Sequence, residues 1–193
     1  MRNSLLGEYH KGTLSMLQVE RNLLLFIIAG TDTTAQTLLG LLLNIICSGK
    51  HITLLQQPTP EAFNTYLDAC IEETLRFSPA VPDILPRFIS AGGLAVPDTN
   101  LVLPEGTEAY SSAYGVSRDP RVFGDDADEF VPERWLSVGE QRTAEMRAAI
   151  MVFGYGTRIC LGKQLAEEEI KLAARKVCSP PCISPVEVGG GRR

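Results

Sequence analysis

Ten residues near the C-terminus, 153–162, read FGYGTRICLG and place one cysteine, Cys160, among glycines, an arginine and a phenylalanine. A cysteine in this setting is suited to hold a haem iron. The soft thiolate is a strong axial ligand for that metal, and its electron donation favours the cleavage of dioxygen. The neighbouring residues must then keep the sulfur ionised and shielded from water.

Four neighbours of Cys160 have residue types that suit this role. Gly156 and Gly162 carry no side chain, so the backbone beside the sulfur can lie against a flat macrocycle. Phe153 is predicted to cover the sulfur and limit water access, and Arg158 to pair with a haem propionate. An isolated cysteine ahead of a helix is more often a buried core residue. The full spacing F-x-x-G-x-R-x-C-x-G favours the metal ligand instead.

The segment that follows, 163–177, is predicted to form a helix. It reads KQLAEEEIKLAARKV, which is rich in good helix formers and carries apolar residues at helical spacing. The first backbone amides of such a helix would lie beside Cys160. Amides in this position stabilise a thiolate.

Polar residues interrupt a second segment, 23–47, that is apolar and long enough to cross a membrane. Asp32 and several threonines lie within it, and an aspartate near the centre of a span costs about 2.5–3.5 kcal/mol. We therefore expect a long central helix buried in a globular core. Apolar residues surround the helix axis in 23–29 and again in 38–46.

The decapeptide around Cys160 resembles the haem-binding signature of the cytochrome P-450 family, the haem-thiolate monooxygenases. Three further motifs of this family follow the expected order: AGTDTT at 29–34, ETLR at 73–76 and PERW at 132–135. The resemblance extends over residues 16–177. It implies that the chain binds heme (iron protoporphyrin IX) through the Cys160 thiolate.

The resemblance also implies the fold and its extent. The expected fold is mainly α with small β-sheet elements and corresponds to the C-terminal half of the cytochrome P-450 fold. Residues 1–177 would form a partial cytochrome P-450 domain. Residues 178–193, rich in proline and glycine, would form an atypical, disordered tail.

In this family the long helix passes over the distal face of the haem. The resemblance therefore implies that Gly30 leaves space for dioxygen and that Thr33 and Asp32 are catalytic. Thr33 would bond a carbonyl one turn earlier, loosen the helix and present a donor or a water to the oxygen, while Asp32 would relay protons. The alternative is that these threonines only satisfy their hydroxyls on the backbone.

Glu73 and Arg76 lie three residues apart on one predicted helix face, which Pro79 and Pro82 should end. Such a pair is usually solvated and stabilises a protein by well under about 1 kcal/mol. The resemblance instead implies a buried structural triad with Arg134, which braces the meander leading to the cysteine loop.

Arg87 lies where the family often supplies a second arginine to a haem propionate. A surface arginine ahead of a strand is an equally good interpretation of PDILPRF. Beyond it, residues 101–110 are predicted to form two short strands around the turn at 104–106. The link at 48–65 is shorter than the family's usual one and is expected to lack a helix.

The function implied by the resemblance is the insertion of one oxygen atom of dioxygen into a hydrophobic organic substrate. Electrons would come from an NAD(P)H-dependent reductase. Basic residues on the helix after the cysteine would face this acidic partner or simply form a solvated face: Lys163, Lys171, Arg175 and Lys176. Apolar residues would face the substrate: Phe26, Ala29, Val81 and Ile84.

Two other functions are compatible with the sequence. The chain could be a catalytically inactive, truncated fragment, because a complete domain of this family is much longer. It could also be a membrane or interaction protein that uses the helix at 23–47, against which the central Asp32 argues.

Composition excludes some classes of partner. The net charge is −5 and the sequence contains no basic run, so a nucleic-acid surface is not expected. Five cysteines without a paired framework suit a reducing compartment. The first twelve residues lack a long apolar core, so neither a signal peptide nor an anchor is expected within them. Full-length members of the family are commonly anchored in the endoplasmic reticulum membrane and face the cytosol.

Overall fold

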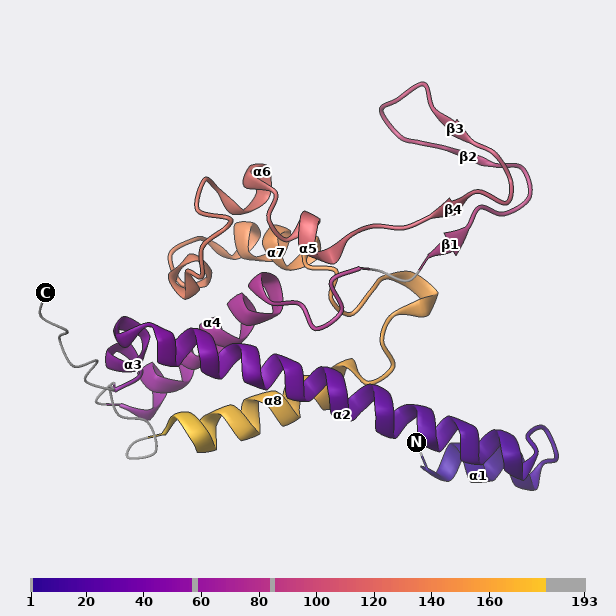
Figure 1. The fold of residues 1–193 in the computed structure, drawn as a ribbon, viewed down its shortest axis with the longest axis horizontal. Coiled ribbons are helices and arrows are strands. Elements are labelled where there is room, and N and C mark those ends of the chain that lie inside the picture. The colour runs from indigo at the N-terminus through magenta and orange to yellow at the C-terminus, as the bar shows by residue number, and fades with distance from the viewer. Residues whose placement is uncertain (1, 57–58, 84–85, 180–193) are drawn as a thin grey trace, which may run out of the picture.

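The structure, a computed structural model, describes residues 2–56, 59–83 and 86–179. Its fold is mainly helical with two small antiparallel sheets, as predicted (Figure 1). Most of the predicted tail, residues 180–193, lies outside the described residues. So does Ile84, one of the apolar residues predicted to face a substrate.

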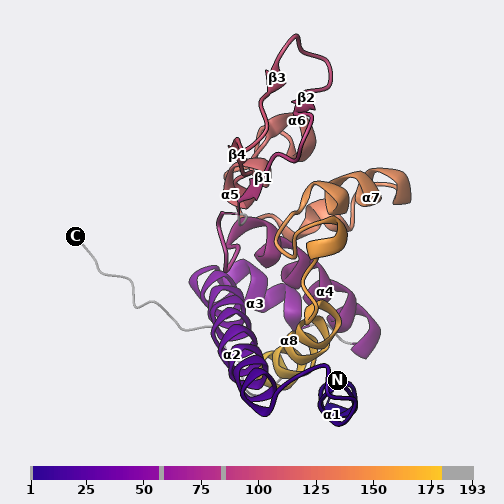
Figure 2. The same ribbon diagram turned by 90° about the vertical axis from the view of Figure 1, so that its right-hand side faces the viewer.

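The longest element is helix α2 (Met16–Cys47), and α1 (Arg2–His10) lies beside its N-terminal part (Figures 1 and 2). A capping box starts α2. The Ser15 hydroxyl accepts a hydrogen bond from the backbone N–H of Gln18 at 3.3 Å, and the Ser15 N–H donates to the Gln18 side chain at 2.8 Å. These bonds satisfy two of the donors that every helix start leaves free.

Only one stripe of α2 is buried, so the prediction of a helix enclosed on all sides is wrong. The stripe consists of Val19, Thr34, Thr37, Leu41 and Ile45. In the N-terminal half, Leu24 and Ile27 are 57% and 64% exposed. In the part of the chain that the structure describes, α2 is the helix long and apolar enough to cross a membrane.

The reason for this difference lies in where the other helices pack. Helices α3 (Gly49–Leu55), α4 (Pro60–Phe77) and α8 (Lys163–Cys178) lie against α2, and the residues of α2 in the shared core, Leu41 and Ile45, belong to its C-terminal half. A periodicity in sequence shows which faces are apolar, but it does not show which partner covers each of them.

Helix α3 also corrects a prediction, since the link at 48–65 was expected to lack a helix. His51, Ile52 and Leu55 are its buried residues. The two apolar side chains join the same core as Leu67 of α4 and Ile170 of α8. This contact explains why a seven-residue helix is stable here, because short helices depend on tertiary packing.

Thr59 caps the start of helix α4, and its hydroxyl accepts a hydrogen bond from the backbone N–H of Ala62 at 3.2 Å. The helix ends at Phe77, ahead of Pro79 and Pro82 as predicted. Its buried side carries both core residues and the Glu73 and Arg76 pair, so α4 connects the helical core to the polar network described below.

Four short strands form a nested pair of ribbons that extends away from the helices (Figures 1 and 2). Their bounds are β1 (Arg87–Phe88), β2 (Leu94–Ala95), β3 (Val102–Leu103) and β4 (Glu108–Ala109). The two strands predicted in 101–110 are therefore confirmed. Each pairs with an earlier strand, since β4 pairs with β1 and β3 with β2.

Gly93 explains the tight connection in the inner ribbon. Its φ is +75°, and a Cβ atom there would lie 2.8 Å from the carbonyl oxygen of Leu103. No L side chain fits that approach without displacing the backbone.

The region between the strands and α8 is built from short elements: α5 (Ala113–Val116), α6 (Pro120–Phe123), the 3-10 helix η1 (Pro132–Trp135), α7 (Glu140–Ala149) and the 3-10 helix η2 (Gly156–Arg158). We call residues 117–135 the meander. A second, smaller core joins it to α4 and α7 through Ala69, Phe123, Ala127, Trp135 and Met146.

Replacement of Leu67 by alanine should destabilise the chain by about 2–5 kcal/mol, because Leu67 is fully buried at the centre of the helical core. Urea unfolding followed by circular dichroism measures this change. Leu24→Ala is the matched control and should alter stability by no more than about 0.5 kcal/mol, because Leu24 is exposed. Equal effects of the two substitutions would contradict this account of the core.

Candidate functional site

The cysteine loop, residues 153–162, is closed by a backbone hydrogen bond. The N–H of Cys160 donates to the carbonyl oxygen of Phe153 at 2.7 Å. Gly154 and Gly156 have φ values of +70° and +68°, a left-handed conformation that glycine adopts without strain. The loop therefore turns back on itself and presents the cysteine directly ahead of α8.

Helix α8 begins at Lys163, which confirms the predicted helix after Gly162. The backbone N–H of Ala166 donates to the Gly162 carbonyl at 2.9 Å, so Gly162 is the N-cap residue, whose carbonyl accepts the first hydrogen bond of the helix. Cys160 lies two residues before this point. The first turn of α8 therefore follows Cys160 closely in the sequence.

The Cys160 side chain is exposed, which differs from the prediction that its neighbours keep it dry. Phe153 is only half-buried, and its ring lies 5.5 Å from the Lys163 ammonium. Tyr155, Ile159 and Leu161 in the same loop are also exposed. Shielding of the sulfur therefore does not come from the loop itself, because its apolar side chains point into solvent.

Two other cysteines are unsuited to be thiolates. Burial raises the pKa of Cys178 to about 11, and burial, together with the nearby Cys178 thiol, also raises the pKa of Cys70. Cys47 is exposed but lies at the end of α2. Cys47 and Cys160 both lie shortly before a helix start, so what distinguishes Cys160 among the described residues is its place in the glycine-containing loop at 153–162.

The loop fits a single thiolate ligand to a haem. At Gly156 no heavy atom lies within 4 Å of the position a Cβ would take, and at Gly162 the nearest atom is the Cys160 sulfur at 4.0 Å. Side-chain bulk therefore does not block the approach to the sulfur from these positions. No group of three or more His, Cys, Asp and Glu side chains gathers within the described ranges. A haem iron needs no such group, because the porphyrin supplies most of its ligands.

The residues predicted to be catalytic, Asp32 and Thr33, lie at the middle of α2. The Thr33 hydroxyl donates to the Ala29 carbonyl at 2.8 Å, the bond predicted from the sequence. The exposed Asp32 carboxylate accepts from the Gln36 amide at 3.3 Å. The helix continues without a break through these residues, so the predicted local loosening is absent. At Gly30 a Cβ would meet nothing within 4 Å, which is consistent with open space beside it.

Thr33 and Asp32 are not joined to the cysteine loop by hydrogen bonds. Across residues 2–56, 59–83 and 86–179, the hydrogen bonds of their side chains remain within α2. Asp32 and Thr33 are neighbours in the sequence, and no hydrogen bond within the described residues connects either side chain to Cys160.

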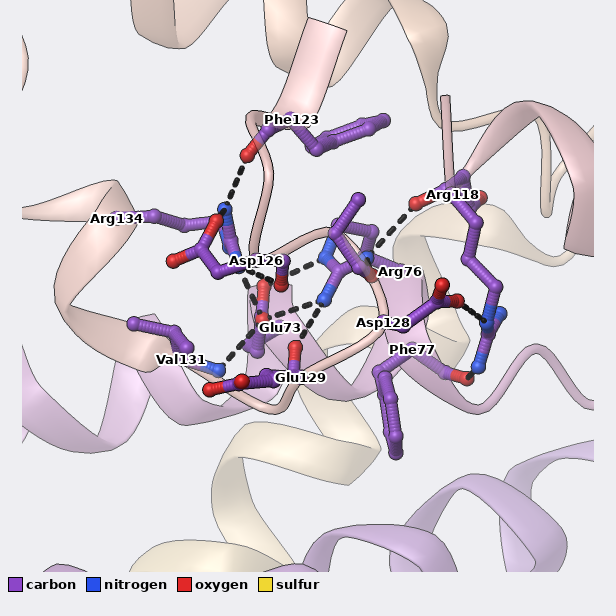
Figure 3. A network of polar contacts seen from close by, with 12 residues as sticks. Glu73, Arg76, Phe77, Arg118, Phe123, Asp126, Asp128, Glu129, Val131 and Arg134 are labelled. Atoms are coloured by element: carbon purple, nitrogen blue, oxygen red, sulfur yellow. Dashed lines mark hydrogen bonds and ion pairs between the residues drawn. The ribbon is translucent and has the colours of Figure 1, made fainter. Parts of the chain in front are cut away.

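Glu73 is the centre of a buried polar network (Figure 3). One carboxylate oxygen accepts hydrogen bonds from Arg76 Nη2 at 2.7 Å, Arg134 Nε at 3.1 Å and the Val131 N–H at 2.8 Å. The other accepts from Arg76 Nε and from the Trp135 indole, both at 2.9 Å. The side chains of Glu73 and Arg76 are completely buried, so the alternative of a solvated ion pair is wrong.

Arg76 also binds the backbone of the meander. Beyond its two bonds to Glu73, its guanidinium donates to three carbonyl oxygens, those of Ser117, Ala127 and Glu129, at 2.8, 2.6 and 2.6 Å. This single side chain therefore fixes three points of the meander against α4.

Arg134 closes the meander from the other side. Its Nη1 donates to the Phe123 carbonyl at 2.6 Å and to the Asp126 carboxylate at 2.9 Å, while its Nη2 donates to the Asp126 carbonyl at 3.0 Å. Neither Asp126 nor Trp135 was predicted to contact the triad, although both bind it in the structure. Trp135 belongs to the PERW motif, which was the available signal for it.

The two arginines predicted to bind propionates lie on different elements. Arg158 is exposed on η2, two residues before Cys160. Arg87 is exposed on β1, and its Nη1 donates to the Pro86 carbonyl at 3.0 Å.

Comparison with known proteins agrees with these motifs. The family model for cytochrome P-450 matches residues 2–177. The cytochrome P-450 monooxygenase mpaDE of Penicillium roqueforti is 36% identical over 164 residues, which cover 75% of this chain and 19% of that protein. The cytochrome P-450 monooxygenase ABA1 of Pyricularia oryzae is 35% identical over 185 residues, which cover 86% of this chain and 36% of that protein.

A third relative, the cytochrome P-450 monooxygenase ACRTS1 of Alternaria alternata, is 33% identical over 175 residues, or 82% of this chain and 46% of that protein. The chain thus spans less than half the length of each of these three relatives. The buried triad, the cysteine loop and the family match over nearly all of the described residues agree: the chain belongs to the cytochrome P-450 family.

Proposed function

We propose that this chain is the haem-binding part of a monooxygenase, which inserts one oxygen atom of dioxygen into a hydrophobic organic substrate. The observation that carries the proposal is the exposed Cys160 thiol in a loop closed onto Phe153 and followed by α8. The relatives above are named monooxygenases, which supports the same reaction class.

Bound haem would supply the activation of dioxygen, and the protein would bind and orient it. Cys160 would hold the haem iron through its sulfur, positioned by its backbone bond to Phe153, and the first amides of α8 would favour the thiolate. Arg158 and Arg87 would pair with the propionates. The Glu73, Arg76 and Arg134 network would hold the meander rigid, so that the loop keeps one conformation.

Thr33 and Asp32 would move protons on the distal side. The Thr33 hydroxyl donates to Ala29 in this structure, so its oxygen still has a free lone pair for a water or a substrate proton. Asp32 is exposed and can exchange protons with solvent.

The partners would be a reductase and an apolar substrate. Phe26, Ala29 and Val81 are exposed, so their apolar surfaces are available for contact. On α8, Lys163 lies 3.8 Å from Glu167, and Arg175 of the same helix lies 3.7 Å from Asp68. At these distances the pairs are weak, so both cations remain available to an acidic reductase that depends on NAD(P)H.

Haem reconstitution tests the proposal. The purified chain should take up haem and give, in the reduced carbon monoxide complex, the Soret band typical of thiolate ligation. Cys160→Ala should abolish that band, whereas Cys47→Ala, which removes another exposed thiol, should leave it unchanged. Failure of the unmodified chain to bind haem would instead favour a catalytically inactive fragment.

The exposed apolar half of α2 favours a second candidate function, association of this helix with a membrane or another protein. The same preparation distinguishes the two. A chain that binds no haem and stays soluble only with detergent would support association through α2. A Cys160-dependent Soret band would support the monooxygenase.

A further inference from the structure

His51 occupies an unusual position for a histidine, since only 4% of it is exposed. It lies on α3, and its ring packs edge-on against Phe130 of the meander at a centroid distance of 5.4 Å. Its Nδ1 lies 2.8 Å from the hydroxyl oxygen of Tyr66 on α4. The imidazole therefore fills the junction between α3, α4 and the meander.

Hydrogen bonding indicates which ring nitrogen of His51 carries a proton. The Tyr66 hydroxyl donates to Glu133 at 3.3 Å, so its oxygen can accept from a protonated Nδ1, and acid would then add the second proton at Nε2 in a junction where only 4% of the residue is exposed. The same Glu133 oxygen receives the Lys50 ammonium of α3 at 2.7 Å. Glu133 precedes Arg134, so this chain of contacts connects α3 to the network around Glu73.

The charges that act on the ring come from three elements within the described part of the chain. They are Lys50 on α3, Glu73 on α4 and Glu133 on η1. Burial is the largest influence and lowers the pKa of His51. The Glu133 carboxylate acts in the opposite direction, Lys50 lowers the pKa further, and the Glu73 carboxylate raises it. The net direction is down, so the folded chain holds the neutral ring.

We propose that His51 is an acid-sensitive latch that holds α3 against α4 and the meander while its ring is neutral. This inference does not depend on haem. In the unfolded chain a histidine binds its proton near pH 6.5, and in the folded chain it does so only at lower pH. Stability is therefore unaffected above about pH 6.5 and declines as the pH falls below it towards the folded pKa.

Nuclear magnetic resonance of the full chain tests the latch, because the sequence contains only two histidines. His10 is exposed and gives the second ring signal. The His51 ring signal should titrate below about pH 6.5, the ordinary midpoint of a histidine. A midpoint for His51 at or above about pH 6.5 would overturn the proposal, and this measurement needs no variant.

A variant then connects the titration to stability. In His51→Asn the side-chain amide can place an N–H donor near the position that Nδ1 of His51 occupies, but it does not titrate. Between pH 7 and pH 5.5, the folding equilibrium constant of the wild type should fall more than that of His51→Asn. The difference should reach up to about eight-fold, the ratio expected for a histidine that binds a proton near pH 6.5 in the unfolded chain but not in the folded chain. His10→Asn should behave as the wild type. The same pH dependence in His51→Asn and in wild type would refute the latch.

Discussion

Replacement of Glu73 by glutamine should lower the free energy of unfolding by about 3–5 kcal/mol, which is a large part of the total stability of a small domain. Glutamine has nearly the same shape, but its neutral amide cannot balance two buried guanidinium groups. One end of it is also a donor and would face the N–H groups of Arg76 or of Trp135. The expected result in urea unfolding is a large fall in the midpoint or loss of the cooperative transition.

Glu72→Gln provides the matched control. Glu72 is adjacent to Glu73 on α4. Its carboxylate accepts a hydrogen bond from Arg147 Nε at 3.0 Å, but the Arg147 side chain is exposed. Removal of such a surface pair should change stability by no more than about 1 kcal/mol. If Glu72→Gln and Glu73→Gln destabilised the chain equally, burial of the network would not be what makes Glu73 important.

Arg76→Lys should be nearly as damaging, by at least about 3 kcal/mol, although it keeps the positive charge. The flat guanidinium of Arg76 donates to Glu73 and to three meander carbonyls at once. A lysine ammonium is a compact group with three donors and cannot match this fork. At least one buried carbonyl would then lose its partner, and the meander should separate from α4.

Hydrogen exchange measures this separation directly. In Arg76→Lys, amides of the meander should exchange faster, whereas those of the helical core around Leu67 should be less affected. Arg147→Lys is the control, because its single exposed pair with Glu72 tolerates either cation. Exchange rates in Arg76→Lys equal to those of the control would show that charge alone holds the meander.

Local features of the fold were predictable from the sequence. The start of α8 after Gly162 and the end of α4 before Pro79 depend on residues next to one another in the chain. The bond from Thr33 to Ala29 is also local, since a helix brings residues four apart together. Predictions of this kind succeed because backbone geometry alone determines the contact.

Features that involve distant segments were not predictable in the same way. The sequence did not show that β4 pairs with β1, that α3 forms, or that one face of α2 remains exposed. Nor did it assign Trp135 and Asp126 to the triad. Each of these outcomes depends on which surfaces meet, and a pattern along the chain does not contain that information.

The sequence by itself determined the family and singled out Cys160 as the predicted metal ligand, because the spacing around Cys160 is a local and specific pattern. Only the tertiary structure decided that Glu73 lies at zero exposure with five hydrogen bonds to it, and that Cys160 is exposed. Burial results from all the segments that pack around a residue, and those segments come together only in the folded chain.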